Sequence, residues 1–359
     1  MVSIIIEHVF APSYWCSQYL RGINHEAKRK NIEITTVENV SKLEKSKDGT
    51  DVAILIGTSL SWLYDTVSIL RRKKIHSVIL SAGRQQNLGS GVSFVTMDYE
   101  DAFEKLTKYL SSIGRERTAL FAPDPDSAID QNKRIAFLNT GKAREECDVY
   151  FFKATLDDAC RSLFDNIDRY DSVICANHIS QVVLTKFLNE QGIRTPEDVH
   201  IAFFGDSEVD RDNGNEHTLV RIKAVEAGKL AIRCVRLLNG YSDLSSVSLN
   251  VRCDIIAKDG MIELDQDTPS TKEAVTNLNS RAYHSHIGDA LMLEKILCNC
   301  DRVDIDILEG IIRKESYSKI AARVHISENT IGYRIKRLMQ FAETTSKDEM
   351  INALRPYLN

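Results

Sequence analysis

The segment spanning residues 171–208 reads DSVICANHISQVVLTKFLNEQGIRTPEDVHIAFFGDSE. It begins with a short apolar run, SVICAN (172–177), and ends with a second one, HIAFFGD (200–206). Between these runs, residues 179–191 carry apolar side chains at helical spacing. A strand, a helix and a second strand in this order predict two parallel strands with a helix packed on the sheet.

The same alternation continues on both sides of this segment. Further strands are predicted at Val2–Ile6, 32–37, 51–59, 77–83, 92–98, 118–123 and 148–152, and helices at 62–72, 101–113 and 224–238, with a first helix marked by Tyr19, Leu20, Ile23 and Ala27. These strands are too many for one small sheet, so the sequence predicts an α/β fold with two lobes built on parallel sheets. In such sheets ligands bind at the carboxyl ends of the strands.

The alternation stops after residues 247–260, and the final 55 or so residues have a helical pattern with no strand signal. Residues 265–279 are polar and contain Pro269, which is typical of a linker. We therefore predict a ligand-binding domain over residues 1–260, a linker and connecting helix over 261–300, and a small all-α domain over 301–359.

The C-terminal domain has the pattern of a helix-turn-helix. Ser327 is a suitable N-cap for a helix in which Ile331, Ile335, Leu338 and Ala342 form a buried stripe. Polar side chains lie on the opposite stripe, where a helix in the major groove of DNA makes its contacts. The predicted DNA-binding residues of the domain are Ser318, Lys319, Ser327, Asn329, Thr330, Tyr333, Arg334, Lys336, Arg337 and Gln340.

The distribution of charge favours the same domain for binding double-stranded DNA. The whole chain has a formal net charge of −5. Residues 313–337, by contrast, contain seven Lys or Arg and two Glu, which predicts a local positive surface. The alternative is a plain helical bundle whose basic residues are solvated.

Residues 316–338, SYSKIAARVHISENTIGYRIKRL, resemble the LuxR/GerE-type DNA-binding domain. The family pattern is S-x-x-x-I-A-x-x-L-x-I-S-x-x-T-V followed by a basic recognition helix. Val324 stands where the pattern has Leu. The matching residues are Ile320, Ala321, Ile326, Ser327, Thr330 and Ile331. The resemblance implies a four-helix domain whose third helix contacts DNA.

Residues 2–258 resemble the sensor domains of LacI/GalR-type regulators, which have the two-lobed periplasmic-binding-protein fold. The family run D-A-I-x-A-x-N-D … G-I-x-V-P-E-D-V-x-V-x-G-F-D-D is matched by Asn177, Gly192, Pro196, Glu197, Asp198, Val199, Phe204 and Asp206. An earlier part of the pattern is matched by Asp98, Gly114 and Arg115. The resemblance implies a small-molecule effector between the lobes and a homodimer.

Three positions depart from the sensor pattern. His178 and Gly205 stand where the family pattern has two acidic residues, and Lys133 stands near the position where the pattern has an arginine. In the family, those acids and that arginine commonly bind sugar hydroxyls. The loss of negative charge favours a sugar or sugar-derived effector that carries a carboxylate or phosphate. The predicted ligand-binding residues are His8, Phe10, Tyr14, Trp15, Ser59, Arg84, Asp98, Lys133, His178 and Asp206.

For these residues a purely structural role stays open as an alternative. Tyr14 and Trp15 can pack under the first helix, His178 can be a core histidine, and Lys133 and Arg84 can point to solvent.

Other classes of protein have less support. The N-terminus lacks the features of a signal peptide, and no run of about 18 apolar residues predicts a membrane span. The eight cysteines are scattered, and the pair Cys298 and Cys300 has no second pair to complete a zinc site, so we expect neither metal nor cofactor. Gly89-Ser90-Gly91 precedes a strand instead of opening a helix, which is wrong for binding phosphate.

The sequence therefore predicts a cytoplasmic, ligand-responsive transcription regulator without enzymatic activity. A solute-binding receptor with no role on DNA and an α/β enzyme are the alternatives.

Overall fold

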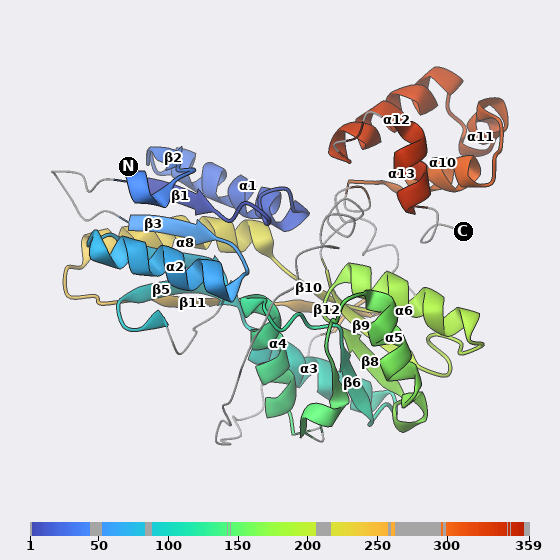
Figure 1. The fold of residues 1–359 in the computed structure, drawn as a ribbon, viewed down its shortest axis with the longest axis horizontal. Coiled ribbons are helices and arrows are strands. Elements are labelled where there is room, and N and C mark those ends of the chain that lie inside the picture. The colour runs from blue at the N-terminus through green and yellow to red at the C-terminus, as the bar shows by residue number, and fades with distance from the viewer. Residues whose placement is uncertain are drawn as a thin grey trace.

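Two α/β lobes and a separate group of four helices make up the protein (Figure 1). The computed structural model describes residues 2–43, 52–82, 88–141, 143, 145–205, 217–257, 260–262, 296, 299–342, 344 and 346–354. The α/β class and the two-lobed architecture predicted from the sequence are confirmed.

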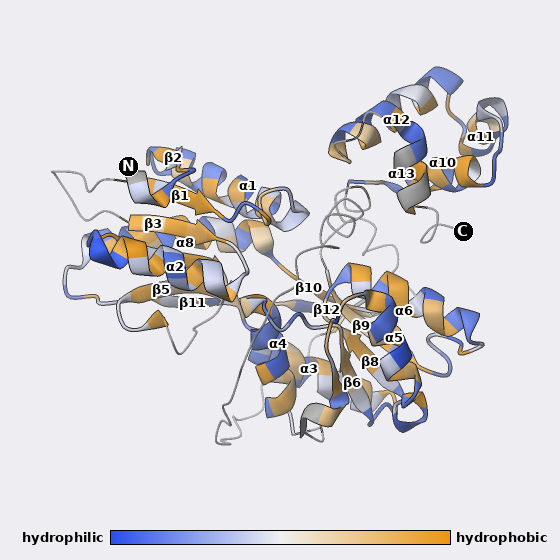
Figure 2. Cartoon of the chain, viewed as in Figure 1, coloured by the Kyte–Doolittle hydropathy of each residue, from blue (hydrophilic) through white to orange (hydrophobic). Residues whose placement is uncertain are grey.

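The first lobe is built on a parallel sheet of six strands. In spatial order these are β11 (Ser248–Val251), β5 (Val92–Met97), β4 (His76–Ser81), β3 (Val52–Ile56), β1 (Val2–Ile6) and β2 (Ile34–Thr36). Strands covered by helices on both faces bury side chains on both, and this is why they are almost continuously apolar (Figure 2). The covering helices are α1 (Tyr14–Arg29) and α8 (Ala224–Gly240) on one face and α2 (Leu60–Arg72) on the other.

Helices α1 and α8 approach each other closely through two glycines. A Cβ atom on Gly22 would lie 2.0 Å from the carbonyl oxygen of Val225, and one on Gly228 would lie 2.2 Å from that of Tyr19. Any larger residue at either position would therefore push the helices apart. Beside this contact the buried carboxylate of Glu26 accepts hydrogen bonds from Arg29 on α1 and from Arg233 on α8. The bonds from Arg29, with a smaller contribution from Arg233, lower the pKa of Glu26 to about 2.

The second lobe contains a sheet of seven strands. Their order is β13 (Gly260–Met261), β12 (Asp254–Ala257), β10 (Thr218–Arg221), β9 (His200–Gly205), β8 (Ser172–Cys175), β6 (Thr118–Phe121) and β7 (Val149–Tyr150). Within the part of the sheet that the structure describes, only β12 runs opposite to the other strands, so its pairs with β10 and β13 are antiparallel. One face packs on α3 (Tyr99–Ser112) and α4 (Ala128–Asn139), and the other on α5 (Leu156–Phe164) and α6 (His178–Glu190).

The chain passes between the lobes three times. It crosses at Asp98 between β5 and α3, at residues 222–223 between β10 and α8, and at residues 252–253 between β11 and β12. Two contacts tie these crossings together. The Asp98 amide donates to the Val251 carbonyl at 2.8 Å, and Lys223 Nζ donates to Asp254 Oδ1 at 2.6 Å. The crossings therefore form one hydrogen-bonded hinge.

The C-terminal helices enclose a core of their own. They are α10 (Arg302–Ile312), α11 (Tyr317–Val324), α12 (Glu328–Phe341) and α13 (Lys347–Leu354). The predicted stripe of Ile331, Ile335, Leu338 and Ala342 is buried in this core. His325 ends α11 in the left-handed conformation, at φ 55°, which turns the chain sharply into α12. The predicted four-helix pattern is confirmed, whereas most of the predicted linker lies outside the described residues.

Two helices of the second lobe were not predicted. The buried face of α4 includes Asp130, Gln131, Lys133 and Arg134, so α4 lacks the apolar periodicity by which a buried helix is recognised. The other missed helix, α5, has only nine residues. No helix of the described residues is long and apolar enough to cross a membrane, and no group of His, Cys, Asp or Glu among them is arranged to hold a metal ion.

Candidate functional site

The two lobes meet through main-chain hydrogen bonds near the carboxyl ends of their strands. The segment that follows β3 lies against the segment that precedes α4. The Ala128 amide donates to the Thr58 carbonyl at 2.8 Å, and the Leu60 amide donates to the Asp126 carbonyl at 3.1 Å. Ser59 and Ser127 pair between them as an antiparallel bridge. This junction links the lobes at the edge where ligands of parallel sheets are expected.

The first lobe's half of the junction is organised by Glu7, directly after β1. Its buried carboxylate accepts hydrogen bonds from the amides of Thr58 and Ser59, at 2.8 and 3.2 Å, and from the Ser59 hydroxyl. Ser59 was among the predicted ligand-binding residues, and Glu7 was missed. An acidic residue immediately after the buried run VSIII is the signal that could have found it.

The second lobe's half contains Lys133, which is almost completely buried. Its ammonium group donates to Asp130 Oδ1 at 2.9 Å and to the Ala176 carbonyl at 2.6 Å. It also lies 5.1 Å from the ring centroid of Phe204, within cation–π range. The alternative in which Lys133 points to solvent is therefore wrong, and its charge is offset within the lobe by Asp130.

A second carboxylate of this half, Asp124, follows β6. Burial raises its pKa to about 6, although it accepts a hydrogen bond from the Asp126 amide at 2.8 Å. The Asp124 amide in turn donates to Asp130 Oδ2 at 3.1 Å. A carboxyl group that changes charge near pH 6 thus lies beside the interlobe junction.

Two predicted ligand-binding positions lie at the starts of helices. Asp98 is the N-cap of α3 and accepts from the Asp101 amide at 3.2 Å. His178 is the first residue of α6, directly after the N-cap Asn177, and its ring lies 5.8 Å from that of Phe203. His178 is only 6% exposed, so its ring is part of the packed lobe.

The other predicted ligand-binding residues are His8 and Phe10 in the loop after β1, Tyr14 and Trp15 at the start of α1, and two further residues. His8 is exposed, whereas Phe10, Tyr14 and Trp15 are half-buried. Tyr14 and Trp15 contact each other edge to face, with ring centroids 5.4 Å apart, and Phe10 and Trp15 pack against the core of the first lobe. Arg84 and Asp206 lie outside the described residues.

Two surface hollows, of about 240 and 170 Å³, lie elsewhere on the first lobe. They are at the amino ends of β3, β4 and β5, and His76 lines both. Neither hollow includes a predicted ligand-binding residue.

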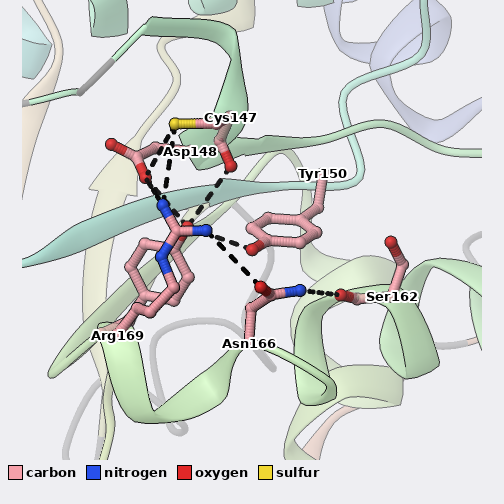
Figure 3. Close-up of polar contacts among 7 residues, drawn as sticks. Cys147, Asp148, Tyr150, Ser162, Asn166 and Arg169 are labelled. Carbon is pink, nitrogen blue, oxygen red and sulfur yellow. Dashed lines mark hydrogen bonds and ion pairs between the residues drawn. The ribbon is translucent and has the colours of Figure 1, made fainter.

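A polar network also lies outside the predicted sites, at the edge strand β7 (Figure 3). The buried carboxylate of Asp148 accepts from the Tyr170 hydroxyl at 2.9 Å and from Arg169 Nη2 at 3.3 Å. The Tyr170 hydroxyl is also 3.0 Å from that of Tyr150, and Arg169 lies 3.7 Å from the sulfur of Cys147. These contacts fasten the edge of the sheet to the loop before β8.

In the C-terminal domain, two predicted DNA-binding arginines face α10 instead of solvent. Arg334 Nη1 donates to Asp301 and to Asp304, each at 2.8 Å, and Arg337 Nη2 donates to the other oxygen of Asp304. The Asp304 side chain is 0% exposed. Removing one partner of a buried ion pair typically costs about 3–5 kcal/mol, so these contacts hold α12 against α10.

Other basic residues of the domain also have acidic partners. Lys319 and Arg323 both pair with Glu315, at 3.4 and 3.1 Å, and Arg313 pairs with Glu309 at 3.0 Å. Much of the positive charge counted along residues 313–337 is therefore balanced within the domain. Of the remaining predicted residues on α11 and its turns, Ser318 is exposed, and Ser327 caps α12 by accepting from the Thr330 amide at 3.1 Å.

One stripe of α12 remains open to solvent. Asn329, Tyr333, Lys336 and Gln340 are exposed, and the exposed fraction of Tyr333 is 70%. They lie opposite the buried stripe, as predicted. The open face of α12 is therefore narrower than predicted, and it contains two amides, a phenol and one ammonium group.

The domain also contacts the second lobe. Ile179, in the first turn of α6, packs against the apolar cluster formed by the C-terminal helices. Its neighbour in the chain is His178, so one helix end borders both the interior of the second lobe and the helix-turn-helix.

Solved structures similar to this chain include transcription regulators, several of them described as members of the LacI family. The transcriptional regulator CelR in complex with cellobiose has a TM-score of 0.59 at 18% sequence identity, covering 71% of this chain and 83% of that one. A LacI-family regulatory protein from Chloroflexus aggregans has a TM-score of 0.58 at 17% identity, covering 73% and 99%. The LacI-family regulator CCPA from Weissella paramesenteroides, with bound sucrose, has a TM-score of 0.53 at 16% identity, covering 74% and 100%.

No protein-family model matches the chain, and no curated protein matches its sequence. Identities this low establish a shared fold and nothing finer. The chain has the two-lobed sensor fold of LacI-family transcription regulators.

Proposed function

We propose that this protein is a ligand-responsive transcription regulator that binds double-stranded DNA through α12. The observation that supports this most strongly is the exposed stripe of Asn329, Tyr333, Lys336 and Gln340 on the third helix of a helix-turn-helix. A helix of this kind fits the major groove, and amide and ammonium groups donate to base edges and phosphates. The resemblance to LuxR/GerE-type domains belongs to this proposal.

The proposed effector is a sugar or sugar-derived compound bound between the lobes. Two of the similar regulators are complexes with cellobiose and sucrose. Lys133, the residue expected to attract an acidic effector, is offset by Asp130, and carboxylates surround the junction. The described residues thus offer no surplus of positive charge, and a neutral compound rich in hydroxyl groups suits them better than a carboxylate or phosphate.

Regulation would follow from the interlobe angle. An effector that binds more tightly at one interlobe angle increases the fraction of molecules that have this angle. Because Ile179 contacts the C-terminal helices from the start of α6, a movement of the second lobe would reach the helix-turn-helix directly. In a cytoplasmic homodimer the change would alter the spacing of two DNA-binding helices, and so their fit to paired half-sites.

The test is a titration of the full chain against DNA from upstream of its own gene, with and without a panel of neutral and acidic sugars. The proposal predicts sequence-specific binding whose affinity changes when one sugar is added. A chain that binds a sugar but no DNA would instead support the solute-receptor alternative.

A further inference from the structure

The exposed stripe of α12 contains no guanidinium group. Asn329, Tyr333, Lys336 and Gln340 follow one another at intervals of four, three and four residues, which places them on one narrow face of the helix. Within the part of the chain that the structure describes, none of these four side chains forms a hydrogen bond or an ion pair. This face is therefore free to contact a ligand.

The two arginines of α12 are committed elsewhere. Arg334 and Arg337 both donate to Asp304, whose side chain is 0% exposed. If either arginine turned towards DNA, a buried carboxylate would lose a partner, which is strongly unfavourable. An Arg bidentate to guanine is the commonest specific contact in the major groove. The ion pairs at Asp304 take this contact away from α12.

The first turn of α12 presents the amide of Asn329 to DNA instead of an arginine. Recognition helices contact base edges with their N-terminal residues, and Asn329 is the second residue of α12. An Asn amide pairs with N6 and N7 of adenine through two hydrogen bonds. The hydroxyl of Thr330, the next polar residue, lies 2.9 Å from the hydroxyl of Ser327 and is hydrogen-bonded to it. Asn329 is therefore the first-turn side chain best placed to read a base.

Tyr333 lies one turn further along the same face. One helical turn rises about 5.4 Å and one base pair about 3.4 Å, so the two side chains reach positions one or two base pairs apart. Tyr333 is 70% exposed, and its ring offers an apolar surface to the methyl group of thymine. Lys336, near the middle of the helix, is placed for a phosphate.

We propose, on the basis of the function proposed above, that α12 selects A·T base pairs: Asn329 reads an adenine, Tyr333 contacts a thymine one or two base pairs away, and no arginine of α12 reads guanine. The same ion pairs that fix α12 on α10 thereby determine the class of DNA half-site.

The experiment is selection from a random DNA library with the full chain, followed by affinity measurements on the selected site. The wild type is expected to enrich a half-site with adenine at one position and an A·T pair close by. Asn329→Ala should lower the preference for that adenine roughly tenfold, since one bidentate contact discriminates by about 1–3 kcal/mol. Gln340→Ala is the matched control, because Gln340 is an exposed amide three turns further along and should leave the preferred sequence unchanged.

Three results would overturn parts of this account, and they are distinguishable. The wild type could select a half-site that contains guanine, and Arg334→Lys or Arg337→Lys could abolish that preference for guanine. This result would contradict the A·T proposal but not the proposed DNA binding. An Asn329→Ala variant that selects the wild-type sequence contradicts the role of Asn329. No enrichment of any sequence by the wild type contradicts the proposed function itself. Because Asn329 is exposed, Asn329→Ala should unfold at the same temperature as the wild type. Equal thermal midpoints will show that a changed sequence preference does not result from misfolding.

Discussion

Arg337 on α12 donates a hydrogen bond to the buried carboxylate of Asp304 at the start of α10, 33 residues earlier in the chain. A basic residue of a helix expected to bind DNA thus belongs to the packing of its own domain. The distinction matters for experiments, because loss of DNA binding in an Arg337 variant can follow from a displaced helix instead of a lost contact.

Arg337→Ala should therefore lower the free energy of unfolding of the C-terminal domain by about 2 kcal/mol, as expected for a hydrogen bond between charged groups. The cost is below that of breaking a fully buried ion pair, because Arg337 is partly exposed and Asp304 keeps Arg334 as a partner. Lys336→Ala, at the neighbouring exposed position, should change it by less than about 0.5 kcal/mol. Urea unfolding of the full chain, followed by a probe in the C-terminal helices, measures both. Equal stabilities for the two variants would show that the pair with Asp304 contributes nothing.

Lys336→Ala should act on DNA binding instead. Loss of one phosphate contact lowers the affinity at fixed salt and reduces the slope of log K against log salt by about 1. Fluorescence anisotropy at several salt concentrations measures both effects. Lys186→Ala on α6 removes the same charge from the second lobe and should leave the slope unchanged. If Lys336→Ala also leaves it unchanged, Lys336 does not contact a phosphate.

Gly228→Ala should destabilise the first lobe. Its Cβ would lie 2.2 Å from the Tyr19 carbonyl oxygen, and overpacking of this kind typically costs about 1–3 kcal/mol. Gly240→Ala, at the end of the same helix, meets no atom within 4 Å and should be neutral or stabilising. Thermal unfolding compares the two. A Gly228→Ala protein as stable as the wild type would mean that α1 and α8 separate without cost.

Stability should fall in mild acid because of two buried histidines. Burial, above all, lowers the pKa of both His200 and His217 from 6.5 to about 4. The folded state therefore favours the neutral rings. The stabilisation is complete above pH 6.5 and is lost as the pH falls from 6.5 towards 4, by roughly 2 kcal/mol for each histidine at pH 5.

Urea unfolding at pH 7 and pH 5 tests this expectation. The variant with His200→Gln and His217→Gln should lose less stability between the two values than the wild type. The same loss in both proteins would assign the acid sensitivity to other groups. Asp124 is not one of them, because its raised pKa makes the folded state more stable as the pH falls.

Ile179→Ser should weaken the response of DNA binding to effector, because it removes the apolar contact between α6 and the C-terminal helices. Effector affinity, measured by calorimetry, should remain within a few fold of wild type. Val183→Ser, one turn along α6 and packed in the second lobe, is the control for a general loosening of the helix. An unchanged response in Ile179→Ser would exclude this contact as the route of coupling.

The sequence predicted those parts of the fold in which side-chain polarity follows burial. Strands such as β3 are buried on both faces and form continuous apolar runs, and α12 shows its buried stripe at helical spacing. Helix α4 was missed because the residues it buries, Asp130 and Lys133 among them, are polar. They can be buried only because they satisfy each other, and no local pattern shows this.

The prediction of the candidate sites from the sequence was incomplete, because those sites depend on contacts between residues that are distant in the chain. Ser59 was predicted, but its partner Glu7 lies 52 residues away and binds mainly main-chain amides, for which the sequence has no signal. The basic window 313–337 suggested an open positive surface because its acidic partners Asp301, Asp304 and Glu309 lie just outside it. Charge counted along the sequence thus overestimated the charge that is open to DNA.

The most direct test of the central claim is a titration of the full chain into labelled DNA from upstream of its own gene. Wild type is compared with the Asn329→Ala/Lys336→Ala double variant at about physiological salt. The account predicts that the wild type binds at least tenfold more tightly than the variant, at equal thermal stability. Indistinguishable affinities, or binding no stronger than to unrelated DNA, would contradict the claim that α12 is the DNA-binding surface.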